Sequence, residues 1–133
     1  MDITLEWLKE KSACQSGVEW FKNQEETDAI KVIEKLIKEN QLNWANWTIC
    51  RVFDYKQRVQ SAVFAAESCI DIFEKRYPDN KKPRQAIEAA KKYIDNPSEE
   101  NKVAAAYAAA YAAYARKNMK IKILTYGISL LKE

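Results

Sequence analysis

The sequence predicts an all-α protein, a single-domain helical bundle or orthogonal array of six to eight helices. The 133 residues include only two glycines and three prolines, whereas turn-rich β folds need more of both residue types. Apolar side chains also recur along nearly the whole chain with the spacing of amphipathic helices. A chain of this length is expected to form one domain, residues 1–133, around a core of its own.

The first two predicted helices are short. Thr4 is placed to cap the first of them. Ser12 and Gln15 have the spacing of a capping box, which predicts that the second helix begins at Ala13. Gly17 lies inside that helix, where glycine costs about 1 kcal/mol relative to alanine. We therefore expect Gly17 to pack closely against another backbone.

The third and fourth predicted helices are separated at Asn40, which suits a helix end. Asn43 is then placed to cap the fourth helix, in the segment QLNWANWTICRVF. Leu42 and Trp47 have the spacing of a hydrophobic staple, in which the residue before the N-cap packs on the fourth residue of the helix. We expect Trp44 and Trp47 at the surface, as aromatic side chains that a partner contacts. The third helix carries an apolar stripe formed by Ile30, Ile33, Leu36 and Ile37.

The fifth and sixth predicted helices flank the break YPDNKKPRQ. The fifth carries the clearest apolar face of the chain, over about five helical turns. Phe64 and Ile72 lie off this face, so two sides of the helix are expected to be covered. Pro83 suits the first turn of the sixth helix. The apolar face of the fifth consists of Val59, Ala62, Val63, Ala66, Cys69, Ile70, Phe73 and Tyr77.

Alanine and tyrosine dominate the last predicted helix, which Asn96 is placed to cap, with Pro97 and Glu99 in its first turn, and which contains VAAAYAAAYAAYARK. Alanine is the best helix former and tyrosine is not typical of disordered segments, so a long helix is predicted. Its small alanines allow neighbours to approach closely, so we expect it to pack at the centre of the bundle. Alternatively, the tyrosines form a partner groove or the seam of a homodimer. The expected stripe comprises Tyr107, Tyr111 and Tyr114 and continues with Ile121, Leu124, Ile128 and Leu131.

Composition limits the location and the cofactors of the protein. No apolar run approaches the roughly 20 residues that span a bilayer, and the N-terminal residues lack a signal-peptide pattern. We therefore expect a cytoplasmic protein with no membrane partner. The chain has three cysteines and no histidine, which excludes the usual Cys/His zinc sites. No cofactor is predicted.

The chain offers little catalytic chemistry. Without histidine, Ser–His–Asp and Cys–His arrangements cannot form within it, and no glycine-rich phosphate loop is present. Cys14 is the one thiol expected in a first helical turn, where we expect it to pack as a small residue, and a thiolate made reactive by the helix dipole is the alternative. Glu67 and Asp71 have the spacing of paired carboxylates, but a second pair of ligands is not evident. A non-enzymatic protein is predicted.

Basic residues form two clusters in the sequence. Such clusters can neutralise phosphates, but the net charge of +3 is mild and no helix-turn-helix signature is present. We expect both clusters to be solvated faces, and the same lysines would equally suit an acidic protein partner. The first cluster contains Lys81, Lys82, Arg84, Lys91 and Lys92, and the second contains Arg116, Lys117, Lys120 and Lys122.

The segment FAAESCIDIFEKRYPDNKKPRQAIEAAKKYI, with the alanine-rich stretch after it, resembles the Imm-5-like family of immunity proteins of bacteria and their phages. Phe73 and Glu74 match a helix end in the family pattern, Pro83 and Arg84 match its turn, and residues 86–90 match the next helix. The likeness covers mainly residues 64–115, and ACQSGVEWF near the N-terminus also looks like a segment of such proteins. The family usually carries histidines where this chain has tyrosines in the alanine-rich helix.

The resemblance implies a non-enzymatic protein that neutralises another protein, either a bacterial toxin or a defence component of the kind that anti-CRISPR proteins inhibit. The alternatives are a nucleic-acid-binding accessory protein and a self-associating structural module. The predicted partner-binding residues are Trp44, Trp47, Asp79, Lys81, Lys82, Arg84, Arg116 and Lys117.

Overall fold

The computed structural model describes residues 1–96, 98 and 119–133. This part of the chain contains seven α-helices and no strand beyond one isolated bridge, so the prediction of an all-α protein is confirmed. The helices are α1 (Leu5–Glu10), α2 (Gln15–Lys22), α3 (Ala29–Lys38), α4 (Leu42–Val52), α5 (Tyr55–Arg76), α6 (Lys82–Asp95) and α8 (Lys120–Lys132).

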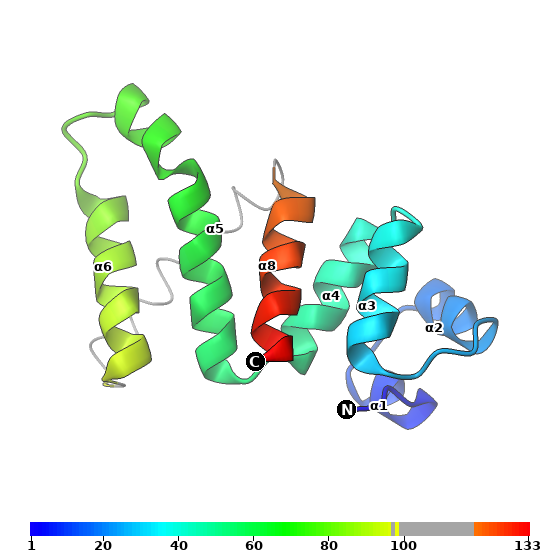
Figure 1. Cartoon of the computed structure of the whole chain (residues 1–133). Helices are drawn as coiled ribbons and strands as arrows, with labels where there is room; N and C mark the ends of the chain where they lie inside the picture. Colours follow the sequence, from blue (N-terminus) through cyan, green and yellow to red (C-terminus); the bar gives the residue numbers. More distant parts are fainter. Residues whose placement is uncertain (97, 99–118) are drawn as a thin grey trace.

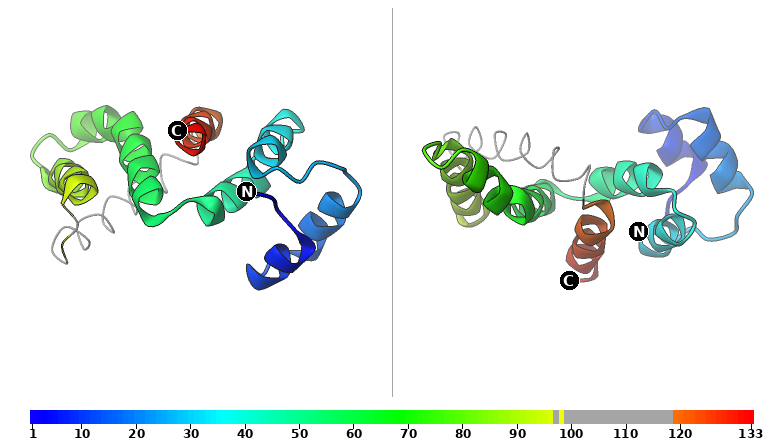
Figure 2. Two further views of the ribbon diagram at one scale, coloured as in Figure 1. Left: turned by 60° about the horizontal axis from the view of Figure 1, so that its bottom comes forward. Right: turned by 90° about the horizontal axis from the view of Figure 1, so that it is seen from above.

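The helices follow one another across the molecule rather than closing into a compact ring (Figure 1). The hairpin of α5 and α6 lies at one end, and α1 and α2 lie at the other (Figures 1 and 2). Helix α8 lies between these parts and contacts α3, α4 and α5. The last helix of the chain therefore joins the N-terminal helices to the hairpin.

Buried side chains form three clusters that follow this arrangement. The largest contains side chains of α1, α2, α3, α4 and α8, including Ile33, Ile49 and Leu124. A second cluster lies between α5 and α6, around Ile87. A third joins α5 to α8 and has only three buried members, which are Ala62, Ala65 and Ile123. Within the described residues, few fully buried side chains thus join the hairpin to the N-terminal core.

The first residues of the chain pack against the start of α3. The Ile3 N–H donates to the Thr27 carbonyl at 2.8 Å, and the Ala29 N–H donates to the Met1 carbonyl at 2.9 Å. These bonds hold Ile3 in the core, where it is only 1% exposed. Periodicity could not reveal this residue as part of the core, because it precedes the first helix.

The start of α1 agrees with the prediction, and the start of α2 does not. The Thr4 hydroxyl accepts a hydrogen bond from the Trp7 N–H at 3.1 Å, as a capping residue should. Ser12, however, has a φ of 59° and ends α1, because its N–H and that of Ala13 bond back to α1 carbonyls. It therefore caps nothing, and α2 begins at Gln15 after Cys14.

A second left-handed residue separates α3 from α4. Asn40 has a φ of 59°, and its N–H donates to the Ile37 carbonyl at 3.0 Å, so the predicted helix end is confirmed. Because α3 ends within two residues at Asn40, α4 begins already at Leu42. The prediction that Asn43 caps α4 is therefore wrong, and Asn43 lies in the first turn instead.

Helix α5 is covered on two sides, as predicted. Its Val59 and Val63 pack toward α6, whereas Phe64 stacks on Tyr126 of α8 with ring centroids 4.1 Å apart. The prediction for its C-terminal end is wrong, because Tyr77 and Ile72 are 49% and 65% exposed. Tyr77 is the C-cap residue with a φ of −132°, so its side chain leaves the helical stripe.

Two further predictions concern the start of α6 and the extent of the last helix. Pro83 lies buried in the first turn of α6, as predicted. A single helix running through to Leu131 is wrong, because Met119 is a non-helical N-cap from which α8 begins. Ile121, which the predicted stripe included, is 56% exposed. The alanine-rich stretch with Tyr107, Tyr111 and Tyr114 lies outside the described residues.

Candidate functional site

An apolar pocket of about 300 Å³ lies among α1, α2, α3 and α4. Each helix contributes one face, because the lining residues are spaced three or four apart along it. The short connections at Ser12 and Asn40 bring these faces together. The helical lining is formed by Leu8 in α1, Gly17, Trp20 and Phe21 in α2, Val32 and Leu36 in α3, and Asn43, Trp44, Trp47 and Thr48 in α4.

Trp44 and Trp47 lie in the wall of this pocket. Both are half-buried rather than fully exposed. The Trp47 ring meets the Trp7 ring edge-on, with centroids 6.1 Å apart. The Arg51 guanidinium lies 4.1 Å from the Trp47 ring centroid on helix α4. These contacts hold Trp47 in a fixed position at the pocket wall.

Trp20 forms the wall on the α2 side. Its indole Nε1 donates to Glu39 Oε1 at 3.3 Å, and the Lys35 ammonium lies 5.8 Å from its ring centroid. The sequence indicated Trp20 only as part of an apolar helix face. Its role at the pocket depends on the packing of α2 against α3, which no local pattern specifies.

Gly17 also lines the pocket, and it does so without the close backbone contact that we expected. A Cβ atom at this position would meet only the Cys14 sulfur, at an ordinary contact distance of 3.4 Å. The glycine therefore keeps the pocket open beside the thiol. A glycine inside an amphipathic helix was the only sequence signal for this part of the site.

Cys14 is exposed and its residue lines the pocket at the N-cap of α2. It lies one position before the first turn in which we expected it. The other two thiols are half-buried. Burial raises the pKa of the Cys69 thiol, which lies 3.5 Å from the Ala66 carbonyl oxygen. Cys14 is therefore the accessible thiol of the described residues.

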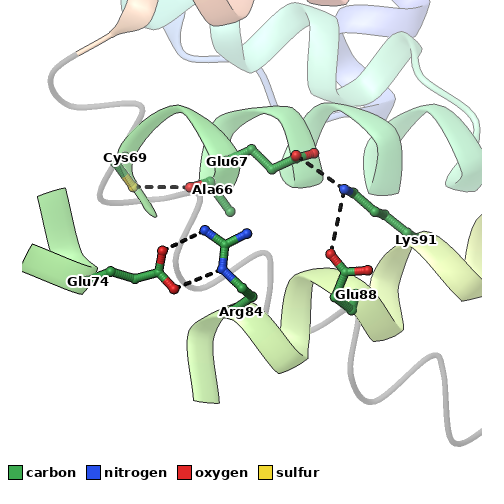
Figure 3. Close-up of polar contacts among 7 residues, drawn as sticks. All are labelled: Ala66, Glu67, Cys69, Glu74, Arg84, Glu88 and Lys91. Atoms are coloured by element: carbon green, nitrogen blue, oxygen red, sulfur yellow. Dashed lines mark hydrogen bonds and ion pairs between the residues drawn. The ribbon is translucent and has the colours of Figure 1, made fainter. Parts of the chain in front are cut away.

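The predicted contact turn between α5 and α6 lies far from this pocket, at the opposite end of the molecule (Figure 1). Asp79, Lys81 and Lys82 are exposed there. Arg84 instead binds Glu74 across the hairpin, with Nε–Oε2 at 2.8 Å and Nη2–Oε1 at 2.5 Å (Figure 3). Arg84 thereby holds the pKa of the Glu74 carboxyl below its usual value.

Lys91 makes a second link across the hairpin. Its Nζ lies 3.2 Å from Glu67 Oε2 and 3.7 Å from Glu88 Oε1 (Figure 3). Glu67 therefore pairs with a lysine rather than with Asp71. Within residues 1–96, 98 and 119–133, no group of three or more Cys, Asp or Glu side chains is placed to hold a metal ion.

The second basic cluster is described only in part. Arg116 and Lys117 lie outside the described residues. Lys122 lies over the Phe64 ring, 5.9 Å from its centroid. Lys120 donates from Nζ to Asn43 Oδ1 at 3.1 Å, which brings its charge to a residue of the pocket wall.

The helices in the described part of the chain are too short or too polar to cross a membrane. No protein-family model, curated protein or solved structure matches the chain significantly. The resemblance to the Imm-5-like immunity proteins therefore stays a prediction from the residues that carry it.

Proposed function

We propose that this chain is a non-enzymatic protein-binding module that neutralises a bacterial toxin or defence protein. The observation that supports the proposal is the apolar pocket with half-buried tryptophans in its wall. Protein interfaces concentrate their binding energy where a large side chain of one partner fills such a pocket on the other. In this proposal, the target inserts one large apolar side chain between α2 and α4.

The polar groups of the pocket wall support binding rather than chemistry. The Thr48 hydroxyl donates to the Trp44 carbonyl oxygen at 2.8 Å, and the Asn43 carbonyl oxygen accepts from Lys120. Both groups are thus engaged within the chain. The resemblance to immunity proteins of bacteria and phages points to the same class of function, and unpaired cysteines suit action in the cytoplasm.

Variants at Gly17 test whether the pocket is the binding site. Gly17→Leu adds a side chain that occupies the pocket, whereas Gly17→Ala adds one methyl group at an ordinary contact distance from Cys14. A tagged protein is used to capture the target from nuclease-treated bacterial extract, and the purified target is then titrated with each variant. We expect Gly17→Ala to bind like the parent and Gly17→Leu to lose binding by about 100-fold, as expected for a filled hot-spot pocket.

Two results would contradict the proposal. One is the absence of any stoichiometric protein partner after nuclease treatment. The other is equal binding of the target by Gly17→Leu and Gly17→Ala. Recovery of nucleic acid that disappears with nuclease would instead favour the nucleic-acid alternative, for which the pairing of Arg84 and Lys91 leaves fewer free cations.

A further inference from the structure

Two cations that contact the α4 wall of the pocket have no carboxylate partner among the described residues. Lys120 bonds to the neutral Asn43 side chain. Arg51 stacks on Trp47 and donates from Nη1 to the Trp47 carbonyl oxygen at 3.1 Å. Each cation thus touches a residue of the α4 wall without being neutralised. Neither takes part in the ion pairs found in residues 1–96 and 119–133.

The opposite wall has a different charge environment. There the carboxylate of Glu39 accepts the Trp20 indole N–H, and Lys35 lies over the same ring. A positive and a negative group thus stand together on the α2–α3 side. On the α4–α8 side, by contrast, Lys120 and Arg51 bind wall residues and no carboxylate of the described residues bonds to that wall.

Two hydrogen-bond donors add to this asymmetry. In the described part of the chain, the indole N–H groups of Trp44 and Trp47 donate to no acceptor, since the hydrogen bonds of these residues involve their backbone carbonyls. A half-buried indole N–H gains from an acceptor that a ligand supplies. The α4 wall thus presents apolar rings, free donors and positive charge.

We propose that the occupant of the pocket is an acidic segment of the partner protein, in which a large apolar side chain is flanked by a carboxylate. This inference rests on the proposed function and adds the chemistry of the partner. The apolar side chain fills the space between the tryptophans, and the carboxylate lies toward Lys120 and Arg51. The net charge of +3 favours the approach of an acidic partner as well.

A pair of dyes tests the charge preference of the pocket without any partner protein. Anilinonaphthalene sulfonate and N-phenylnaphthylamine share one apolar ring system, and only the first carries an anionic group. We expect the anionic dye to bind about ten-fold more tightly in fluorescence titrations at low salt, and this difference to shrink at high salt. Gly17→Leu is expected to abolish the binding of both dyes.

Charge-removal variants identify the groups responsible. Lys120→Gln and Arg51→Gln are each expected to weaken binding of the anionic dye about three-fold and to leave the neutral dye unchanged. Lys122→Gln and Arg58→Gln are the matched controls, because these cations lie on Phe64 and on the Cys50 carbonyl oxygen instead. Circular dichroism of each variant checks that the helices are intact.

The inference is overturned if both dyes bind equally well, if the control variants weaken binding as much as Lys120→Gln, or if Gly17→Leu leaves binding unchanged. Its failure is separate from that of the proposed function. A pocket that prefers the anionic dye without any captured target would contradict the protein-binding function alone. A target whose binding depends on Gly17, combined with no dye preference, would contradict the acidic partner alone.

Discussion

Gly127 allows α8 to lie directly against α4. A Cβ atom at this position would stand 2.7 Å from Ile49 Cδ1 and 3.0 Å from Phe53 Cζ. Both side chains are buried, with 3% of their surface exposed, so neither can move away freely. This contact could not be predicted from the sequence, because a glycine in an amphipathic helix does not show which residues of another helix lie against it.

Gly127→Ala is therefore predicted to destabilise the protein. Overpacking of a core costs about 1–3 kcal/mol, and the better helix propensity of alanine returns about 1 kcal/mol. We expect a net loss of about 1 kcal/mol in the free energy of unfolding, measured with urea. Gly17→Ala is the matched control, and it is expected to be neutral or stabilising because its new methyl group meets only the Cys14 sulfur, at an ordinary contact distance of 3.4 Å.

Ile49→Val tests the cause of this loss, because it removes the Cδ1 atom that a Cβ at position 127 would meet. The single variant is expected to cost about 1 kcal/mol. In the double variant, the two losses should fall short of their sum by about 1 kcal/mol. Strictly additive losses would mean that the steric contact is not the reason for the glycine.

The three thiols are predicted to react in a fixed order with a disulfide reagent such as DTNB. Cys14 is exposed and should react first, on the order of ten-fold faster than Cys50 and Cys69. Burial raises the pKa of the Cys69 thiol above its usual 9.0, so its rate should rise at a higher pH than that of a free thiol. Mass spectrometry of partly labelled protein gives the order, and equal labelling of all three residues would contradict it.

The stability that this thiol contributes has a defined pH dependence. Its pKa is raised in the folded state, so the contribution is fully present below the usual value of 9.0 and is lost as the pH rises through the folded value. The Cys69 thiol therefore changes the free energy of unfolding with pH only in alkaline solution and not near neutral pH.

At the scale of elements, the hairpin of α5 and α6 is held at its closed end by one ion pair. Arg84 in the first turn of α6 binds Glu74 in the last turn of α5 through two hydrogen bonds (Figure 3). The pairing lowers the pKa of Glu74, so its stabilising contribution is present above the usual value of 4.5 and is lost as the pH falls through the lowered value.

Glu74→Gln is predicted to lower the melting temperature at neutral pH and to have little effect in acid. The difference between parent and variant, measured at about pH 7 and at about pH 3 by thermal unfolding, should shrink at the lower pH. Glu88→Gln is the control, because the ion pair of Glu88 within the described residues is with Lys91 of its own helix, at 3.7 Å. A difference that stays constant with pH would show that the charge of Glu74 is not what holds the hairpin.

Helix identity could be predicted from the sequence, whereas several helix ends could not. The predictions at Thr4, Asn40 and Pro83 are confirmed, because each depends on one residue and its own turn. Those at Ser12 and Asn43 are wrong. In both places the preceding helix ends in a left-handed residue, and that ending decides where the next helix begins.

The candidate site was predictable at its α4 wall and, through Gly17 and Cys14, at the start of α2. Trp44 and Trp47 stand out as tryptophans in one helical segment, and both line the pocket. The other walls come from α1, α2 and α3, whose apolar faces read as ordinary core. Only the packing of four helices leaves a cavity between them, and single-sequence periodicity contains no information on how well faces fit.

For the whole molecule, the packing of α5 on α8 decides whether the α5–α6 hairpin unfolds before the N-terminal core. Helix α8 is anchored in the large N-terminal core through Leu124 and Ile128. The hairpin contacts α8 through Ile123, which packs on Ala62 and Ala65, and through the stack of Phe64 on Tyr126. Two helices alone bury little apolar surface, so the hairpin depends on α8, whereas the N-terminal core does not depend on the hairpin.

Ile123→Ala is therefore predicted to loosen the hairpin while leaving the N-terminal core intact. Deleting a buried isoleucine side chain costs about 2–5 kcal/mol, and here the loss should appear as faster hydrogen exchange in α5 and α6 but not in α3. Ile33→Ala removes the same atoms from the large cluster, at a residue with 0% exposure. That control should speed exchange in α3 and in the hairpin together, because the hairpin loses its anchor when the core opens. If Ile123→Ala speeds exchange in α3 as much as in α6, the molecule unfolds as one cooperative unit, which would contradict separate unfolding of the hairpin.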